Sequence, residues 1–69
     1  MNLPDIETVA DKAHEAWMAS KKAQGVTSRK AEDGEELMVP YAQLSEKAKD
    51  LDRGMITAVY AAIRAASHD

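Results

Sequence analysis

One segment of the chain constrains the fold more than any other, because between residues 6 and 23 small and apolar side chains recur every three or four positions. That spacing gathers them on one side of an α-helix, in a stripe about 140° wide. The stripe consists of Ile6, Val9, Ala10, Ala13, Ala16, Trp17, Ser20 and Ala23. Pro4 is suited to a first helical turn, Asp5 adds favourable negative charge there, and Gly25 is typical of a helix end. The sequence therefore predicts an amphipathic helix that ends before Gly25.

Trp17 is the only tryptophan, and the chain has just two tyrosines and no phenylalanine beside it. On a helical wheel Trp17 lies at the edge of the apolar stripe, with His14 and Lys21 next to it on the polar side. From that edge the indole can pack one face inward and present the other face to a groove. A tryptophan in a small domain is as often simply its largest core residue. Both interpretations, ligand platform and core residue, are kept.

Length and composition limit what the chain can be. Its 69 residues predict one domain over 1–69, and a domain of this size buries only about 60% of the surface of its unfolded chain. There is no cysteine, and the two histidines are isolated, so we expect neither disulfides nor a metal site nor a cofactor. The core must then hold alone or with a partner subunit.

Charge and hydropathy restrict the partners. A net charge of -3 makes nucleic acid an unlikely partner, because domains that bind the phosphate backbone are usually basic. No apolar run reaches 18 residues, and the start of the chain, with Pro4 and Asp5, does not resemble a secretory leader. We expect a soluble, cytoplasmic protein without a membrane partner.

The periodic pattern disappears between residues 25 and 38. Residues 26–28 and 37–39 could form two short strands that turn at Asp33 and Gly34, so the sequence predicts a long loop with at most a short β-hairpin. The charges of this loop are mixed, which is typical of a solvated surface. Long loops in small domains are more often functional or mobile than idle.

The second half of the chain predicts more helix. Pro40 forces the preceding residue into extended geometry, and Ser45 is a good N-cap for a short helix over Glu46–Asp50. A longer helix is predicted from Leu51 or Asp52 to about Ala66. Its expected inner face consists of Met55, Ile56, Val59, Ala62, Ile63 and Ala66.

Basic groups border this last helix as they border the first. Tyr60 is expected at the rim of the apolar face, between Arg53 and Arg64. Arg64 and His68 near the end of the helix suit its negative pole. Two helices are therefore each expected to present an aromatic ring edged by basic groups.

Several motifs together resemble a known family. They are Ile6-Glu7, His-Glu-x-Trp at 14–17, Gly25 eight residues after Trp17, and Val-Pro-Tyr-x-x-Leu-Ser-x-x-x-Lys-x-x-Asp-Arg at 39–53. This combination is similar to the RyR domain, the repeat of ryanodine receptors that also occurs as small bacterial and phage proteins. The resemblance covers residues 6–64. Family members usually carry an aromatic directly after the glycine and a Tyr-Gly beyond it, whereas this chain has Val26, Thr27 and Ser28.

The resemblance implies a mainly α, compact helical domain with two main helices, a short intervening helix and a long loop. It also implies a module that binds an adenine nucleotide or nucleotide-derived signal, as a sensor or a phage sponge. Residue by residue, Trp17 would stack on a base and Lys21 would face phosphate, with His14, Tyr41 and Arg53 as supporting residues. A base stacked in this way contributes ~1–3 kcal/mol.

Each supporting residue also has a structural interpretation. His14 can be a packing residue, and Lys21 a solvated helix end. Tyr41 after Pro40 can be a plug over the core, and Arg53 a member of an ion-pair set within its helix.

Catalysis finds little support in the sequence. No serine and histidine positions suggest an activated nucleophile, and no glycine-rich phosphate loop occurs, so we expect no enzyme. Two classes of function remain. One is a ligand-binding module, and the other is a protein-interaction module, most simply a homodimer that buries Trp17 and Tyr60 at its interface.

Overall fold

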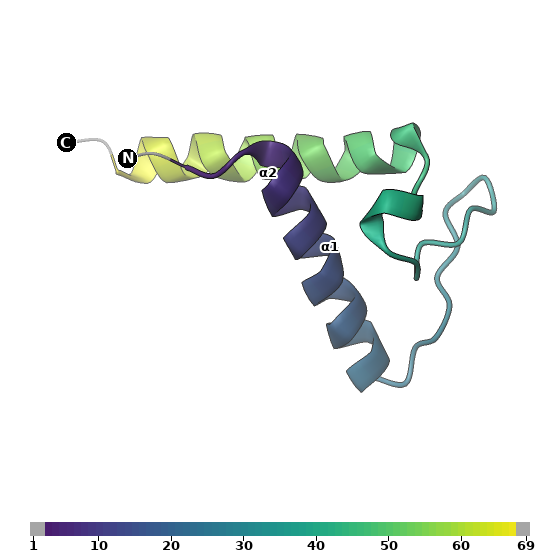
Figure 1. Cartoon of the computed structure of the whole chain (residues 1–69). Helices are drawn as coiled ribbons and strands as arrows, with labels where there is room; N and C mark the ends of the chain where they lie inside the picture. Colours follow the sequence, from purple (N-terminus) through teal and green to yellow (C-terminus); the bar gives the residue numbers. More distant parts are fainter. Residues whose placement is uncertain (1–2, 68–69) are drawn as a thin grey trace.

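The computed structural model describes residues 3–67, and it is mainly helical, as predicted. Two helices, α1 (Ile6–Ala23) and α2 (Glu46–Ala66), are separated by a long loop and a single 3-10 turn, η1 (Tyr41–Gln43). In Figure 1, α1 starts beside the middle of α2 and runs away from it at an angle, and the loop returns to the beginning of α2. These three segments enclose the site described below. His68, expected near the end of the last helix, lies outside the described residues.

The ends of α1 follow from side chains that satisfy its free backbone groups. The Asp5 carboxylate accepts hydrogen bonds from the Thr8 backbone N–H (3.0 Å) and the Thr8 hydroxyl (2.9 Å), which makes Asp5 the N-cap. Pro4 therefore precedes the cap, and the prediction that it lies in the first turn is wrong. At the other end Gly25 adopts a φ of 83°, and its N–H donates to the Lys22 carbonyl at 2.9 Å. Gly25 is the predicted stop.

The α2 helix is longer than the sequence pattern predicts, because the segment Glu46–Asp50 and the last helix are continuous. Ser45 caps it and accepts a hydrogen bond from the Ala48 N–H at 3.1 Å. The sequence has no proline after Ser45, and a single glycine, Gly54, weakens a helix without breaking it. The predicted short helix and the last helix therefore join into one. The short intervening element is instead η1, which begins directly after Pro40.

The loop forms no strand in the described structure, only one antiparallel bridge between Lys30 and Glu36. The Glu36 carboxylate accepts the backbone N–H groups of Arg29 (2.8 Å) and Met38 (3.0 Å), together with the Ser28 hydroxyl. Because these donors are satisfied by one side chain, the expected pairing of residues 26–28 with 37–39 does not extend into a ladder. The turn itself falls where predicted, with Gly34 at a φ of 89°.

The core is small and lies where α1, η1 and one side of α2 meet. Its buried apolar residues are Ala10, Tyr41, Leu44, Ala48, Ile56 and Tyr60. The expected inner face of α2 is therefore only partly right, since Ile56 and Ile63 pack inward while Met55 and Val59 are exposed. Ala62 and Ala66, also expected inside, are exposed as well.

Tyr60 explains why the buried side of α2 differs from the predicted one. Expected at the rim, it is only 6% exposed, and its hydroxyl donates to the Pro4 carbonyl at 2.7 Å. The N-terminal segment and α1 thus cover the side of α2 that carries Tyr60 and leave the side with Met55 open. An aromatic ring with a satisfied hydroxyl buries more apolar surface than the neighbouring Met55 would in the same place.

Candidate ligand-binding cleft

A cleft of about 560 Å³ lies between the middle of α1, the tip of the loop and the first half of α2. This volume is within the range of small-molecule sites. Most of its wall is apolar. The lining residues are Ala13, His14, Trp17, Ala31, Glu32, Asp33, Glu35, Leu37, Leu44, Lys47, Ala48, Leu51, Asp52, Met55 and Ile56.

Trp17 lines this cleft and is partly buried. The prediction that it lies at the edge of the inner face of α1 is wrong, because His14 beside it is buried and Lys21 is partly buried. The exposed residues of the predicted stripe are Ala13, Ala16, Ser20 and Ala23. One neighbour of the indole is the His14 ring, which stacks on it with centroids 5.5 Å apart and an interplanar angle of 28°. Because the indole is held from its own helix and still borders the cleft, it can offer flat aromatic surface to a bound group.

His14 is held by Trp17 on its own helix, by the end of the loop and by α2. It is 6% exposed, and its Nε2 lies 2.8 Å from the Val39 carbonyl, which can only accept, so Nε2 carries a proton. Its Nδ1 faces the Asp52 carboxylate at 3.7 Å. Burial raises the pKa of Asp52, and a protonated His14 ring opposes that shift. His14 therefore packs as a structural residue and at the same time supports Trp17.

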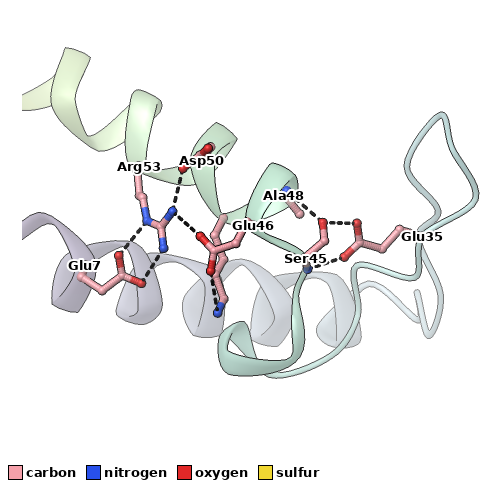
Figure 2. A network of polar contacts seen from close by, with 8 residues as sticks. Glu7, Glu35, Ser45, Glu46, Ala48, Asp50 and Arg53 are labelled. Atoms are coloured by element: carbon pink, nitrogen blue, oxygen red, sulfur yellow. Dashed lines mark hydrogen bonds and ion pairs between the residues drawn. The ribbon is translucent and has the colours of Figure 1, made fainter.

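The polar part of the lining is mostly acidic. Glu32, Asp33, Glu35 and Asp52 contribute carboxylates, and Lys47 is the basic residue of the lining, 3.8 Å from Asp33. Glu35 is held in place by the Ser45 N–H (2.8 Å) and hydroxyl (2.7 Å), as Figure 2 shows. A phosphate inside the cleft would meet these negative charges, so an anionic group is better placed outside it.

Lys21 lies one helical turn after Trp17 and is not among the residues that line the cleft. Within the described part of the chain its amine makes no ion pair of 4 Å or less. Positions four apart share one face of a helix, so Lys21 can meet a group that extends beyond Trp17.

Tyr41 belongs to the core and not to the cleft. Its ring is 4% exposed, tilted against His14 at 6.3 Å, and carries the Lys49 amine 5.6 Å from its centroid. Its hydroxyl is buried without a hydrogen-bond partner among the described residues. Burial raises the pKa of Tyr41, and the nearby Glu7 carboxylate raises it further. Tyr41 fits the plug interpretation.

Arg53 joins the two helices and does not line the cleft. Its Nε and one terminal nitrogen reach the Glu7 carboxylate at 2.7 and 3.1 Å, and the other terminal nitrogen reaches Glu46 at 3.0 Å and Asp50 at 2.6 Å (Figure 2). The Arg53 guanidinium is the main reason that the pKa of Glu7 is lowered, and these carboxylates in turn raise the pKa of Arg53. Arg53 is therefore an interhelical clamp.

The structure thus brings Trp17 and His14 to the cleft, places Lys21 beyond it, and uses Tyr41 and Arg53 elsewhere. Sequence reasoning did not identify the apolar wall contributed by Leu44, Leu51 and Met55. The helical spacing did not assign Leu51 to an apolar face, because Leu51 lies at the predicted start of the last helix. Within residues 3–67 no group of three or more His, Asp or Glu side chains is arranged to hold a metal ion.

A small helical domain with an apolar cleft beside a half-buried tryptophan is the class of protein that these features define. The RyR domain model matches residues 4–68, and the chain belongs to the RyR domain family. No curated protein and no solved structure matches the chain. Neither described helix has the length and hydropathy needed to cross a bilayer.

Proposed function

We propose that this chain is a non-enzymatic, ligand-binding module that stacks the base of an adenine nucleotide, or of a nucleotide-derived signal, on Trp17. The observation that carries the proposal is the position of the indole, which is half-buried and borders a mostly apolar cleft of about 560 Å³. A base of this kind gains ~1–3 kcal/mol from stacking on an aromatic side chain. Apolar walls and a few polar groups are typical of small-molecule sites.

The charges around the cleft suggest how the ligand is oriented. The base enters between Trp17 and the wall of α2, and the phosphate points out toward Lys21, away from the acidic side chains of the loop. Each additional phosphate near Glu32 and Asp33 costs electrostatic energy, so ligands with few negative charges are favoured. The chain then acts as a cytoplasmic sensor or sponge, encoded by a bacterium or a phage.

The chemistry of the lining supports binding over catalysis. Among the residues around the cleft there is no serine, threonine or cysteine that could act as a nucleophile. His14 could accept a proton only through Nδ1, because its Nε2–H donates to the Val39 carbonyl, and Nδ1 faces the Asp52 carboxylate at 3.7 Å. A nucleophile and an oriented base within reach of each other are the minimum for covalent catalysis.

The proposal is tested by titrating the single tryptophan fluorescence with adenosine, AMP, ATP, ADP-ribose and a cyclic dinucleotide. We expect saturable quenching by at least one of these compounds. Lys21→Ala should weaken the binding of AMP and leave the binding of adenosine unchanged. Lys22→Ala, which changes the adjacent exposed lysine, should alter the affinity for neither compound. Absence of saturable quenching by all five compounds would count against the nucleotide proposal.

A second candidate function is self-association, and one observation favours it specifically. Leu51, Met55 and Val59 leave a row of large apolar side chains exposed on α2. The expected interface changes in one respect, because Tyr60 is buried in its own subunit and is not available to a partner.

A further inference from the structure

The second half of α2, Gly54–Ala66, is almost uncharged, and apart from the inward-facing Ile56, Tyr60 and Ile63 its residues are exposed. Arg64 is its only charged residue, and the Arg64 guanidinium lies 5.8 Å from the centre of the Tyr60 ring. Figure 1 shows this half of the helix extending past the start of α1, with the N-terminal segment running along one side of it. Surface helices normally carry charged residues on their outer face. This half therefore has the composition of a helix buried against other elements, although most of its surface is exposed to solvent.

Three large apolar side chains define a continuous row along this helix. Leu51, Met55 and Val59 follow one another at intervals of four residues and are 71%, 67% and 47% exposed. Ala58 and Ala62 lie beside them and are exposed as well. We call these five residues the α2 stripe. Small residues next to large ones let a second helix approach closely and interlock with the row.

The accessible surface and the radius of gyration of the chain are both larger than expected for a compact monomer, which agrees with an interface for a partner. Folded monomers of this mass expose roughly 4,200 Å² of accessible surface. This chain of 7.5 kDa exposes 4946 Å². The excess, about 700 Å², is close to the ~800 Å² that each partner buries in an interface of standard size. The radius of gyration is also large, since 13.7 Å compares with about 11 Å for a compact domain of 69 residues.

We propose that the α2 stripe is the seat of a second copy of this chain, with the two α2 helices packed antiparallel about a two-fold axis near Met55. Leu51 of one copy then meets Val59 of the other, and Met55 meets its own counterpart. The row is self-complementary because it has an apolar group of similar size on each side of Met55. No charged residue belongs to the stripe, so the copies associate there in spite of a net charge of -3 each. This gives the second candidate function a defined surface.

The same surface connects self-association to ligand binding. Leu51 and Met55 line the cleft and also belong to the α2 stripe. The second copy therefore stands at the edge of the cleft and covers part of its α2 wall. The dimer binds the cleft ligand more tightly than the monomer, because it shields more of the ligand from water.

Sedimentation equilibrium of the full chain across a range of concentrations tests the interface without any ligand. We expect the wild type to reach twice 7.5 kDa and Met55→Glu to weaken the dimer at least about tenfold, because it buries a carboxylate at the axis. Thr57→Glu, an exposed change on another side of the same helix, should leave the mass unchanged. A wild type that stays monomeric at all concentrations would overturn the proposal and assign the stripe to another occupant. A Met55→Glu variant that dimerises as strongly as the wild type would overturn it too.

Cross-linking tests the geometry separately, because the chain contains no cysteine. Helices packed 8–10 Å apart bring the facing Cα atoms to roughly 4–6 Å, which suits a disulfide. Met55→Cys should therefore form a covalent dimer on mild oxidation, and Thr57→Cys should not. Equal cross-linking of both variants would contradict the two-fold axis. These results do not depend on a nucleotide, so failure of the dimer and failure of the ligand proposal are distinguished.

Discussion

The two halves of α2 differ sharply, although they form one uninterrupted helix. In the first half, Glu46–Arg53, six of the eight residues are charged. Among them Arg53 reaches α1 through Glu7, and Lys47 reaches the loop through Asp33. In the second half, Gly54–Ala66, one residue is charged and many apolar side chains face outward. The first half thus builds the fold and one wall of the cleft.

The second half shows how far packing partners decide the role of an apolar residue. Met55 and Tyr60 lie on the same helix, one turn and a half apart, and only Tyr60 is covered by the N-terminal segment. Two large side chains on one helix thus have different roles, a core residue on the covered side and an exposed residue on the open side. The predictions that follow test this contrast.

Tyr60→Ala should have the largest effect. It removes a buried ring and its hydrogen bond to the Pro4 carbonyl, at a cost of ~3–5 kcal/mol. A domain of 69 residues has only a few kcal/mol to lose, so the variant should be largely unfolded in a denaturant titration monitored by circular dichroism. Met55→Ala, measured at a concentration where the wild type is monomeric, should change the free energy of unfolding by less than ~0.5 kcal/mol. Similar losses for the two variants would remove the contrast between the sides of α2.

Arg53→Ala should lower the melting temperature next most strongly. Without the guanidinium, the carboxylates of Glu7, Glu46 and Asp50 repel one another across the contact between α1 and α2. Added salt should therefore recover part of the loss, since it screens that repulsion. Arg29→Ala is the matched control, because its side chain makes no ion pair among the described residues. If both arginine variants melt alike, Arg53 is not a clamp.

Glu36→Gln should alter the response to acid. Hydrogen bonds from the Ser28 hydroxyl and from the Arg29 and Met38 N–H groups lower the pKa of Glu36 from 4.5 to about 2. The folded pKa lies below the unfolded one, so this stabilisation is complete above pH 4.5 and is lost as the pH falls toward 2. The protection of the loop amides from hydrogen exchange, measured relative to the intrinsic rate at each pH, should fall over that range in the wild type. In Glu36→Gln this protection should already be low at neutral pH, and a wild-type profile in this variant would refute the assignment.

Two glycines should respond in opposite directions, with the smallest effects. Gly54 lies inside α2 with open space around it, so Gly54→Ala should stabilise the chain by ~0.5–1 kcal/mol. Gly34 has a φ of 89°, and Gly34→Ala should destabilise it by ~1–2 kcal/mol through backbone strain. Thermal melting of both variants checks the pair. A destabilised Gly54→Ala would indicate that a close contact already occupies this part of α2.

Local features of the sequence predicted part of this structure well. The limits of α1 follow from Asp5, Gly25 and the three-and-four spacing between them, all of which act within one or two helical turns. The same spacing did not predict which side of α1 is buried, because Ala13 and Ala16 of the predicted stripe are exposed while His14 is buried. The family and the mainly helical fold could also be predicted, from motifs spread over most of the chain.

Features that depend on distant contacts could not be predicted. In α2 the apolar residues Met55, Ile56, Val59 and Tyr60 cover so much of the helix surface that the spacing did not decide which side faces α1. The partner of Arg53, Glu7, lies 46 residues away in the sequence. The loop position that brings acidic side chains to the cleft depends on the hydrogen bonds of Glu36, which no helix or strand pattern contains.

The central claim is that Trp17 is a platform for a bound base, and NMR of its indole N–H tests this most directly. Because the chain has one tryptophan, a ¹⁵N–¹H spectrum contains one indole signal to follow during titration with AMP. We predict that this signal shifts saturably together with the amides of Leu44 and Ala48 in the cleft wall, while the amide of Ile63 stays in place. An indole signal that remains fixed, or that moves only together with every amide of the chain, would contradict the account.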